Sequence, residues 1–194
     1  MVFATRVDSP VFLPCWTSQD EKKKLQKTDH DMADTFLDSN NSPALQHGTA
    51  RDPRIHDLIE YWTSKLRGRA MPSRSDIDPA EIVRLLPFIA LVDVIPDTPI
   101  EKRYRVRLFG TQLVEFHQKD WTGKQIFDVT SSEAAQRIVQ AGEFCVNHHR
   151  PWLSSGKLYW ANHKSAKQFE IVIAPLSADG AIVNMLLALL VIVP

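Results

Sequence analysis

The sequence is short of cysteine, has no excess of charge of either sign and contains no apolar run long enough to cross a bilayer. The two cysteines, Cys15 and Cys145, lack the spacing of a disulfide framework, which is typical of reduced thiols in a cytosol. The 23 basic residues equal the 23 acidic ones, so no overall field draws the chain to nucleic acid or anionic lipid. The most apolar segment, residues 181–193, is too short for a membrane span and contains Asn184. We therefore expect a cytoplasmic protein with no nucleic-acid partner and no membrane insertion.

Local catalytic and metal-binding motifs are absent as well. The sequence contains no G-x-S-x-G, H-E-x-x-H, Walker loop or G-x-G-x-x-G, which excludes the enzymes that carry these signatures. We predict that the protein is not an enzyme, and a site assembled from distant residues such as His117, Asp120 and His163 is the alternative. Cys145 and His149 stand four residues apart on a predicted helix, but two ligands do not make a tetrahedral metal site. We therefore expect no metal and no haem, and a protein that binds haem or a metal ion is kept as the lesser alternative.

The first 50 residues differ in composition from the rest. They are rich in Asp, Ser, Asn, Thr and Lys and show no sustained apolar period, so we predict a mobile N-terminal tail over residues 1–50. Residues 51–87 are predicted to form an N-terminal helical cap, and residues 88–194 the core. A single domain is expected because a chain of 194 residues with 44% hydrophobic content can bury one good core.

An amphipathic helix is predicted at the start of the helical cap. Asp52 suits its N-cap, Pro53 fits its first turn, and Gly68 is a stop signal. Apolar residues recur at i, i+3, i+4, i+7 and i+11 and form one stripe, which we expect to serve as a partner or dimer face: Ile55, Leu58, Ile59, Trp62 and Leu66.

A second helix is predicted from Asp78-Pro79-Ala80-Glu81. Asp78 suits the N-cap, Pro79 the first position, and Glu81 the position that closes a capping box back onto the cap. Pro87 ends this helix. Asp76 and Asp78 are therefore interpreted as structural residues rather than as paired catalytic carboxylates.

Two strands follow the helical cap and are predicted to pair as a hairpin. Residues 88–95 are rich in β-formers and end in a turn cluster over residues 96–99. The second strand alternates strictly, so its side chains divide between two faces. We expect Tyr104, Val106 and Leu108 on the buried face and Arg103, Arg105 and Arg107 on the other.

The three arginines have two interpretations. They can form a patch for an anion or an acidic partner, or they can pair with acids on the covering helix, such as Glu60 or Asp57. We favour the pairing, because mixed charge on a sheet surface is ordinary.

The back half of the chain is predicted to hold one long helix and three strands. Thr130 and Glu133 form a capping box that opens a helix to about His148. Strands are predicted at residues 151–161, 168–176 and 181–193. Two strands, a helical crossover and a three-strand meander make an α+β domain with one antiparallel sheet.

This order of elements, together with five motifs, resembles the PAS domain family. The motifs are Tyr61-Trp62, the Arg-x-Met-Pro-x-Arg-x-Asp-Ile-Asp-Pro segment of residues 69–79, the Leu-Leu-Pro and following strand of residues 85–93, the Tyr-Arg-x-Arg-Leu-x-Gly-Thr strand of residues 104–111, and Thr122-Gly123. They are similar to those of short, single-domain bacterial PAS proteins, alphaproteobacterial ones especially. The resemblance is densest over residues 61–123, covers nothing before about residue 50, and rests on element order alone after residue 123.

The resemblance implies a five-stranded antiparallel sheet curved around helices, and an apolar cavity that can hold a small ligand. It also implies a sensory or adapter module that binds a partner signalling protein, because no output domain has room to fit in 194 residues. The flavin-binding Asn-Cys-Arg-Phe segment of photosensor PAS domains is not present, so no cofactor is predicted. Core packing accounts equally well for the aromatic residues that could line the cavity: Tyr104, Phe109, Phe116, Phe127, Phe144, Trp152 and Trp160.

The main alternative to the sensor is a homodimeric structural module whose cavity is filled by its own side chains. In that case the amphipathic helix of residues 52–67 is the expected dimer element. The sequence itself names neither a ligand nor a partner.

Overall fold

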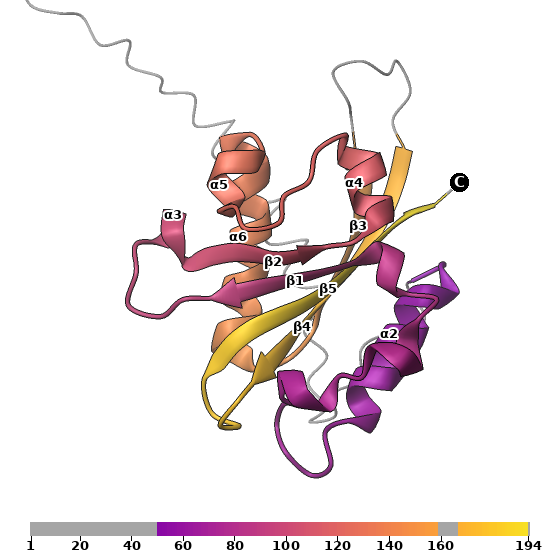
Figure 1. The fold of residues 1–194 in the computed structure, drawn as a ribbon, viewed down its shortest axis with the longest axis vertical. Helices are drawn as coiled ribbons and strands as arrows, with labels where there is room; N and C mark the ends of the chain where they lie inside the picture. Colours follow the sequence, from indigo (N-terminus) through magenta and orange to yellow (C-terminus); the bar gives the residue numbers. More distant parts are fainter. Residues whose placement is uncertain (1–49, 159–166, 194) are drawn as a thin grey trace, which may run out of the picture. The chain divides into compact units, whose positions relative to one another are not determined.

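Five antiparallel strands form one sheet, and helices lie against both of its faces (Figure 1). The computed structural model describes residues 50–158 and 167–193. The strands lie in the order β2-β1-β5-β4-β3. This confirms the predicted α+β class, while the predicted tail over residues 1–50 lies outside the described residues apart from Ala50. The strands are β1 (Ile89–Val94), β2 (Tyr104–Phe109), β3 (Trp152–Leu158), β4 (Lys167–Ser177) and β5 (Val183–Val193).

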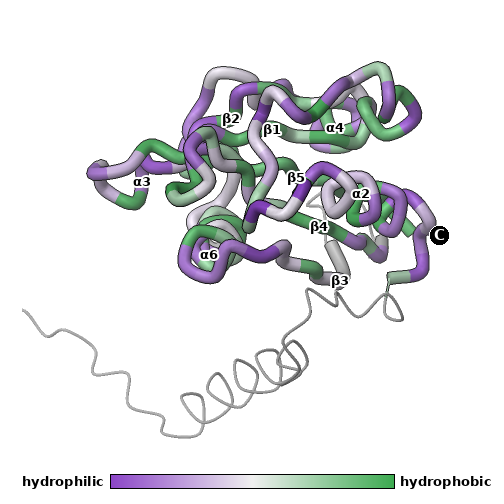
Figure 2. The backbone as a smooth tube through the Cα atoms, turned by 90° about the horizontal axis from the view of Figure 1, so that it is seen from below, coloured by the Kyte–Doolittle hydropathy of each residue, from purple (hydrophilic) through white to green (hydrophobic). Residues whose placement is uncertain are grey.

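The two central strands, β4 and β5, are apolar on both faces. Successive side chains of a strand point to opposite faces, yet neighbours such as Val172 and Ile173, or Leu186 and Leu187, are all buried. Helix α2 (Pro53–Ser64) covers one face, which we call the outer face, and α6 (Ser132–His148) covers the other, the inner face. Figures 1 and 2 show α2 and α6 on opposite sides of β4 and β5.

Helix α2 begins where the sequence predicts. The Asp52 carboxylate accepts a hydrogen bond from the Arg54 N–H at 3.0 Å, and Pro53 occupies the first turn. The helix ends at Ser64, earlier than the predicted stop at Gly68, because the Lys65 and Leu66 N–H groups bond three residues back and tighten the last turn.

The apolar stripe of α2 is buried against the chain's own sheet. Ile55, Leu58, Ile59 and Trp62 are all at most 2% exposed. The Trp62 indole N–H donates to the Pro175 carbonyl at 2.9 Å. The expectation that these four residues offer a partner or dimer face is therefore wrong for this conformation, since β4 and β5 already occupy them. Leu66, the fifth member of the stripe, is partly buried and packs against the same core.

A buried carboxylate fixes the chain just before α2. Glu170 on β4 is 4% exposed, and its two oxygens accept the backbone N–H groups of Arg51 and Asp52 at 2.9 to 3.0 Å. These contacts join residues 118 and 119 positions apart in the sequence. The helical segment therefore belongs to the same compact unit as the strands.

The predicted second helix is a single 3₁₀ turn, η2 (Pro79–Ile82). Asp78 caps it as predicted, accepting from the Ala80 N–H at 2.9 Å. Glu81 does not close the predicted capping box, because the Asp78 N–H donates instead to the Tyr61 hydroxyl at 2.7 Å. The Glu81 carboxylate pairs with Lys65. Two further 3₁₀ turns, η1 (Arg74–Asp76) and η3 (Leu86–Phe88), flank η2.

The predicted hairpin of β1 and β2 is present, but β2 does not alternate to its end. A bulge in β2 shifts the register: Leu108 pairs with Leu91 and Val106 with Val92, so that Arg107 is the extra residue between them. Leu108 is consequently 43% exposed rather than buried as predicted. Arg103 lies outside the strand, at the end of the one-turn helix α3 (Ile100–Arg103).

The back half follows the prediction with shifted boundaries. Helices α4 (Thr111–His117) and α5 (Ile126–Val129) precede α6. The N-cap of α6 is Ser131, which accepts from the Ala134 N–H, and not Thr130. The cap therefore lies one residue later than predicted, and residue 133 occupies the second helical position instead of the third. None of the helices in the described part of the chain is long and apolar enough to cross a membrane.

We predict that Trp62→Phe lowers the free energy of unfolding by about 1–3 kcal/mol. The substitution leaves the buried Pro175 carbonyl without its donor and leaves a void beside β4. Urea unfolding followed by circular dichroism measures the change. Glu60→Gln on the exposed side of α2 is the control, with an expected change within about 0.5 kcal/mol. Equal effects of the two substitutions would contradict the assignment of Trp62 as an anchor.

Candidate functional site

Helix α6 lies in direct contact with the inner face of the sheet. A Cβ atom at Gly142 would approach the Tyr104 ring to 2.8 Å, so only glycine fits here without movement. One turn further along, the fully buried Cys145 thiol donates to the Ile173 carbonyl at 3.4 Å. Burial raises the pKa of the Cys145 thiol to about 12, so it stays protonated. The interior at this point is filled by the chain's own side chains.

Glu143 on α6 fastens the helix to the start of β2. It accepts two hydrogen bonds from Arg103 Nη1, at 2.9 and 3.1 Å, and one from the Tyr104 hydroxyl at 2.6 Å. Burial, followed by the bond to Glu143, raises the pKa of Tyr104 well above its usual value. Arg103 pairs with an acid as we expected, but the acid lies on α6 and not at Glu60 or Asp57.

A cluster of four aromatic rings gathers at the end of α4. The His117 ring lies 4.3 Å from Trp121, 4.8 Å from Phe116 and 5.6 Å from Phe109, between ring centroids. Phe109 also stacks on Trp121 at 4.9 Å. Burial lowers the pKa of His117 to about 4, so the imidazole is neutral at pH 7. Two predicted pocket residues, Phe109 and Phe116, are partly exposed in this cluster.

The other predicted pocket residues lie in different places. Phe144 packs edge-on against Trp152 at 5.0 Å and stacks on His148 at 4.3 Å. Phe127 on α5 is partly buried against the core, and Tyr104 is held under α6. Trp160 lies outside the described residues. The candidates are therefore distributed over separate clusters of the inner side, and Trp121 joins one of them without having been predicted.

Arg105 and Arg107 share one carboxylate on the outer face. Arg105 Nη2 lies 3.0 Å from Asp93 Oδ2, and Arg107 Nε lies 2.7 Å from Asp93 Oδ1. The favoured interpretation of pairing holds, but the acid belongs to the neighbouring strand and not to a covering helix. Asp93 is the only polar residue of the buried strand β1, and this isolation within the sequence Ile-Ala-Leu-Val-Asp-Val is the signal that could have identified it.

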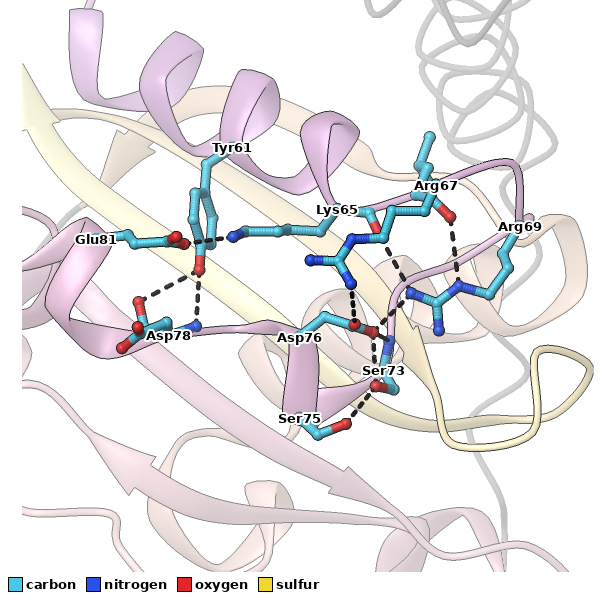
Figure 3. A network of polar contacts seen from close by, with 10 residues as sticks. Tyr61, Lys65, Arg67, Arg69, Ser73, Ser75, Asp76, Asp78 and Glu81 are labelled. Carbon is cyan, nitrogen blue, oxygen red and sulfur yellow. Dashed lines mark hydrogen bonds and ion pairs between the residues drawn. The ribbon is translucent and has the colours of Figure 1, made fainter.

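The residues of the longest motif form a polar network between α2, η1 and η2 (Figure 3). The Asp76 carboxylate accepts from the Ser73 N–H at 2.8 Å and pairs with Arg69 at 2.7 Å. The hydrogen bonds from Ser73, and then that from Arg69, hold the pKa of Asp76 well below its usual range. The Tyr61 hydroxyl donates to the Asp78 carbonyl and accepts its N–H, and burial raises the pKa of Tyr61 to about 12. Both aspartates are therefore structural, as interpreted from the sequence.

A shallow groove of about 360 Å³ lies beside this network. Tyr61 and Asp57 on α2 form one wall, and the η2–η3 segment with Val83 and Arg84 forms the other. None of the predicted pocket residues lines it.

The residues considered for catalysis or metal binding do not form a site in the described structure. Within residues 50–158 and 167–193, no group of three or more His, Cys, Asp or Glu side chains is placed to hold a metal ion. Cys145 is buried, and His149 ends α6 in the left-handed conformation with φ 56°. Asp120 caps a turn by accepting from the Thr122 N–H at 2.8 Å, and His163 lies outside the described residues.

One of the comparisons with known proteins identifies a family. A family model described as "PAS domain" matches residues 50–191. No curated protein matches the chain. Three similar solved structures are all of low identity. They are the PAS domain of BvgS from Bordetella pertussis (15% identity, TM-score 0.43, covering 61% of this chain and 88% of that one), a PAS domain from Colwellia psychrerythraea (8%, 0.42, 59% and 95%) and a domain of an HTR-like protein from Haloarcula marismortui (13%, 0.40, 55% and 98%).

We predict that Gly142→Ala destabilises the protein by up to about 2 kcal/mol. Overpacking against the Tyr104 ring costs about 1–3 kcal/mol, which outweighs the roughly 1 kcal/mol that alanine gains over glycine inside a helix. Chemical unfolding of Gly142→Ala, of Tyr104→Leu and of the double variant measures the change in the free energy of unfolding. The second substitution removes the clashing ring, so the double variant should lose less than the two single variants added together. A single variant more stable than the wild type would show that free space remains under α6.

We predict that the stability of the protein falls as the pH drops from about 6.5 to about 4. The pKa of His117 is about 4 in the folded protein and about 6.5 in the unfolded chain, so between these values only the unfolded state binds the proton. The unfolding equilibrium constant then rises by up to about tenfold per pH unit. The urea concentration at the midpoint of unfolding should change less with pH across this range in His117→Leu than in the wild type. A wild type and variant with parallel pH profiles would contradict the buried, neutral state of His117.

Proposed function

The chain belongs to the PAS domain family, and we propose that it is a non-catalytic sensory or adapter module that acts by binding a partner signalling protein in the cytoplasm. The observation that carries this proposal is the contact of α6 with the sheet at Gly142 and Cys145. Side chains of the protein fill the interior between α6 and the sheet, so this space is not available to a ligand. We therefore place signalling in contacts of the protein surface with a partner. The apolar stripe of α2 is already used within the chain, so we do not propose a homodimer built on it.

We propose a small apolar ligand as a second function, and it is supported by the ring cluster around His117. Phe109 and Phe116 keep part of their surface exposed, while Trp121 is 6% exposed and forms a fixed base. The two ring nitrogens of the neutral His117 imidazole are polar groups in an otherwise apolar surface. Many small-molecule sites combine an apolar lining with a few polar groups in this way.

We also propose that the chain belongs to the short, single-domain subfamily that its motifs resemble. The polar network supports this, because two pairs of motif residues are bonded in it: Arg69 donates to Asp76, and the Asp78 N–H donates to Tyr61. Residues joined by such bonds should change together among relatives. An alignment in which Arg69 and Asp76 vary independently would contradict it.

We predict that the immobilised full-length protein captures one signalling protein from a native lysate, and that this protein binds again when both are purified. Titration calorimetry with the purified pair measures the binding. Native mass spectrometry of freshly purified protein tests the second function in parallel. A bound ligand should appear as added mass that Phe116→Ala loses and that Phe144→Ala retains.

Two outcomes would count against these proposals. Failure of every captured protein to bind in purified form would overturn the adapter function. If protein purified without denaturant has only the mass of the polypeptide, the ligand-binding function is overturned. Phe144→Ala is the matched control, because it also removes a partly buried phenylalanine of the inner side but lies in the other ring cluster.

A further inference from the structure

Two arginines on the edge strand β2 are held in fixed positions by one buried carboxylate. The Asp93 side chain is 11% exposed, whereas those of Arg105 and Arg107 are 47% and 56% exposed. Arg105 and Arg107 stand two residues apart in β2 and lie on the outer face, within reach of the same acid, and the bulge at Arg107 brings Leu108 to that face as well. Each guanidinium donates one N–H to Asp93, and its other N–H groups are not bound to that carboxylate.

These other N–H groups have no partner among the described residues, and both side chains are exposed to solvent. One carboxylate against two guanidiniums leaves an excess positive charge at this place. A held guanidinium loses less conformational freedom on binding an anion than a mobile side chain does. The pair is therefore arranged in advance for a second carboxylate.

An exposed apolar side chain stands beside the pair. Leu108 follows Arg107 directly, is 43% exposed, and pairs with Leu91 across the outer face. An anion site next to an aliphatic side chain fits a peptide that carries acidic and apolar residues in sequence. It fits a nucleic acid poorly, because such binding rests on many phosphate contacts and the chain has a formal net charge of 0.

We infer that the Arg105–Arg107 pair with Leu108, which we call the β2 docking face, binds an acidic segment of the partner protein. A carboxylate of that segment bridges the two guanidinium forks, and a neighbouring aliphatic residue covers Leu108. This inference rests on the proposed adapter function and adds the chemistry of the partner. It also explains how Arg105 and Arg107 can both pair within the chain and remain available to an anion.

The test is a direct titration of the purified full-length protein, followed by fluorescence anisotropy. The probe is a fluorescein-labelled ten-residue peptide of the repeat Glu-Glu-Leu-Ser-Gly, and the comparison peptide has Gln in place of each Glu. We expect the acidic peptide to bind at least tenfold more tightly than the Gln peptide. Raising the salt from 50 to 500 mM should weaken the binding, because the partly exposed charges are then screened.

Variants locate the site. Arg105→Gln with Arg107→Gln should weaken binding of the acidic peptide by about tenfold or more. Adding Asp93→Asn gives a triple variant with no orphaned buried carboxylate, and it should be folded by circular dichroism and equally weak in binding. Arg84→Gln with Arg150→Gln removes the same charge from two other exposed arginines and should leave binding within twofold.

Equal binding of the acidic and Gln peptides, or unchanged binding by the folded triple variant, would overturn the inference. Failure here is distinct from failure of the adapter function. If a purified partner binds the triple variant as well as the wild type, the adapter function stands and the β2 docking face is wrong. If the triple variant loses both the peptide and the partner, the two proposals are supported together.

Discussion

The structure depends on the need to cover two central strands that are apolar on both faces. β4 and β5 present buried residues to either side, so neither strand can border water. Covering one face needs α2, which precedes the sheet in sequence, and covering the other needs α6, which crosses over between β2 and β3. The helical segment before the strands is therefore a required layer of this domain and not an attachment to it.

Local sequence signals predicted most of the fold because local interactions decide those features. The caps at Asp52 and Asp78, and the succession of helices and strands along the chain, follow from chemistry within a few residues. Features that depend on residues far apart in the sequence were not predictable in this way. The Tyr61 hydroxyl accepts the N–H that Glu81 was expected to bind, and the bulge at Arg107 of β2 turns Leu108 to the outer face. Neither is visible in a single window of sequence.

The sequence predicted which types of residue form the candidate sites, but it did not predict which residues they contact. The sequence indicated that the arginines of β2 pair with acids, yet it pointed to α2, because cross-strand register is not set by alternation alone. The pocket candidates were chosen as aromatic residues, and the structure divides them between two ring clusters, Phe127, and Tyr104 under α6. The grouping around His117 depends on α4 folding back toward Phe109, which composition does not encode.

The contacts of the Glu170 carboxylate also determine which residue a folded fragment of this domain has to start from. Its two oxygens receive the N–H groups of Arg51 and Asp52, and both groups belong to residues before the first helical turn. A fragment that starts at Pro53 would retain every element of the fold, yet it would leave a buried anion without donors. Fragments made for binding or spectroscopic work should therefore start upstream of Arg51, even though no helix or strand of the PAS domain lies there in the described residues.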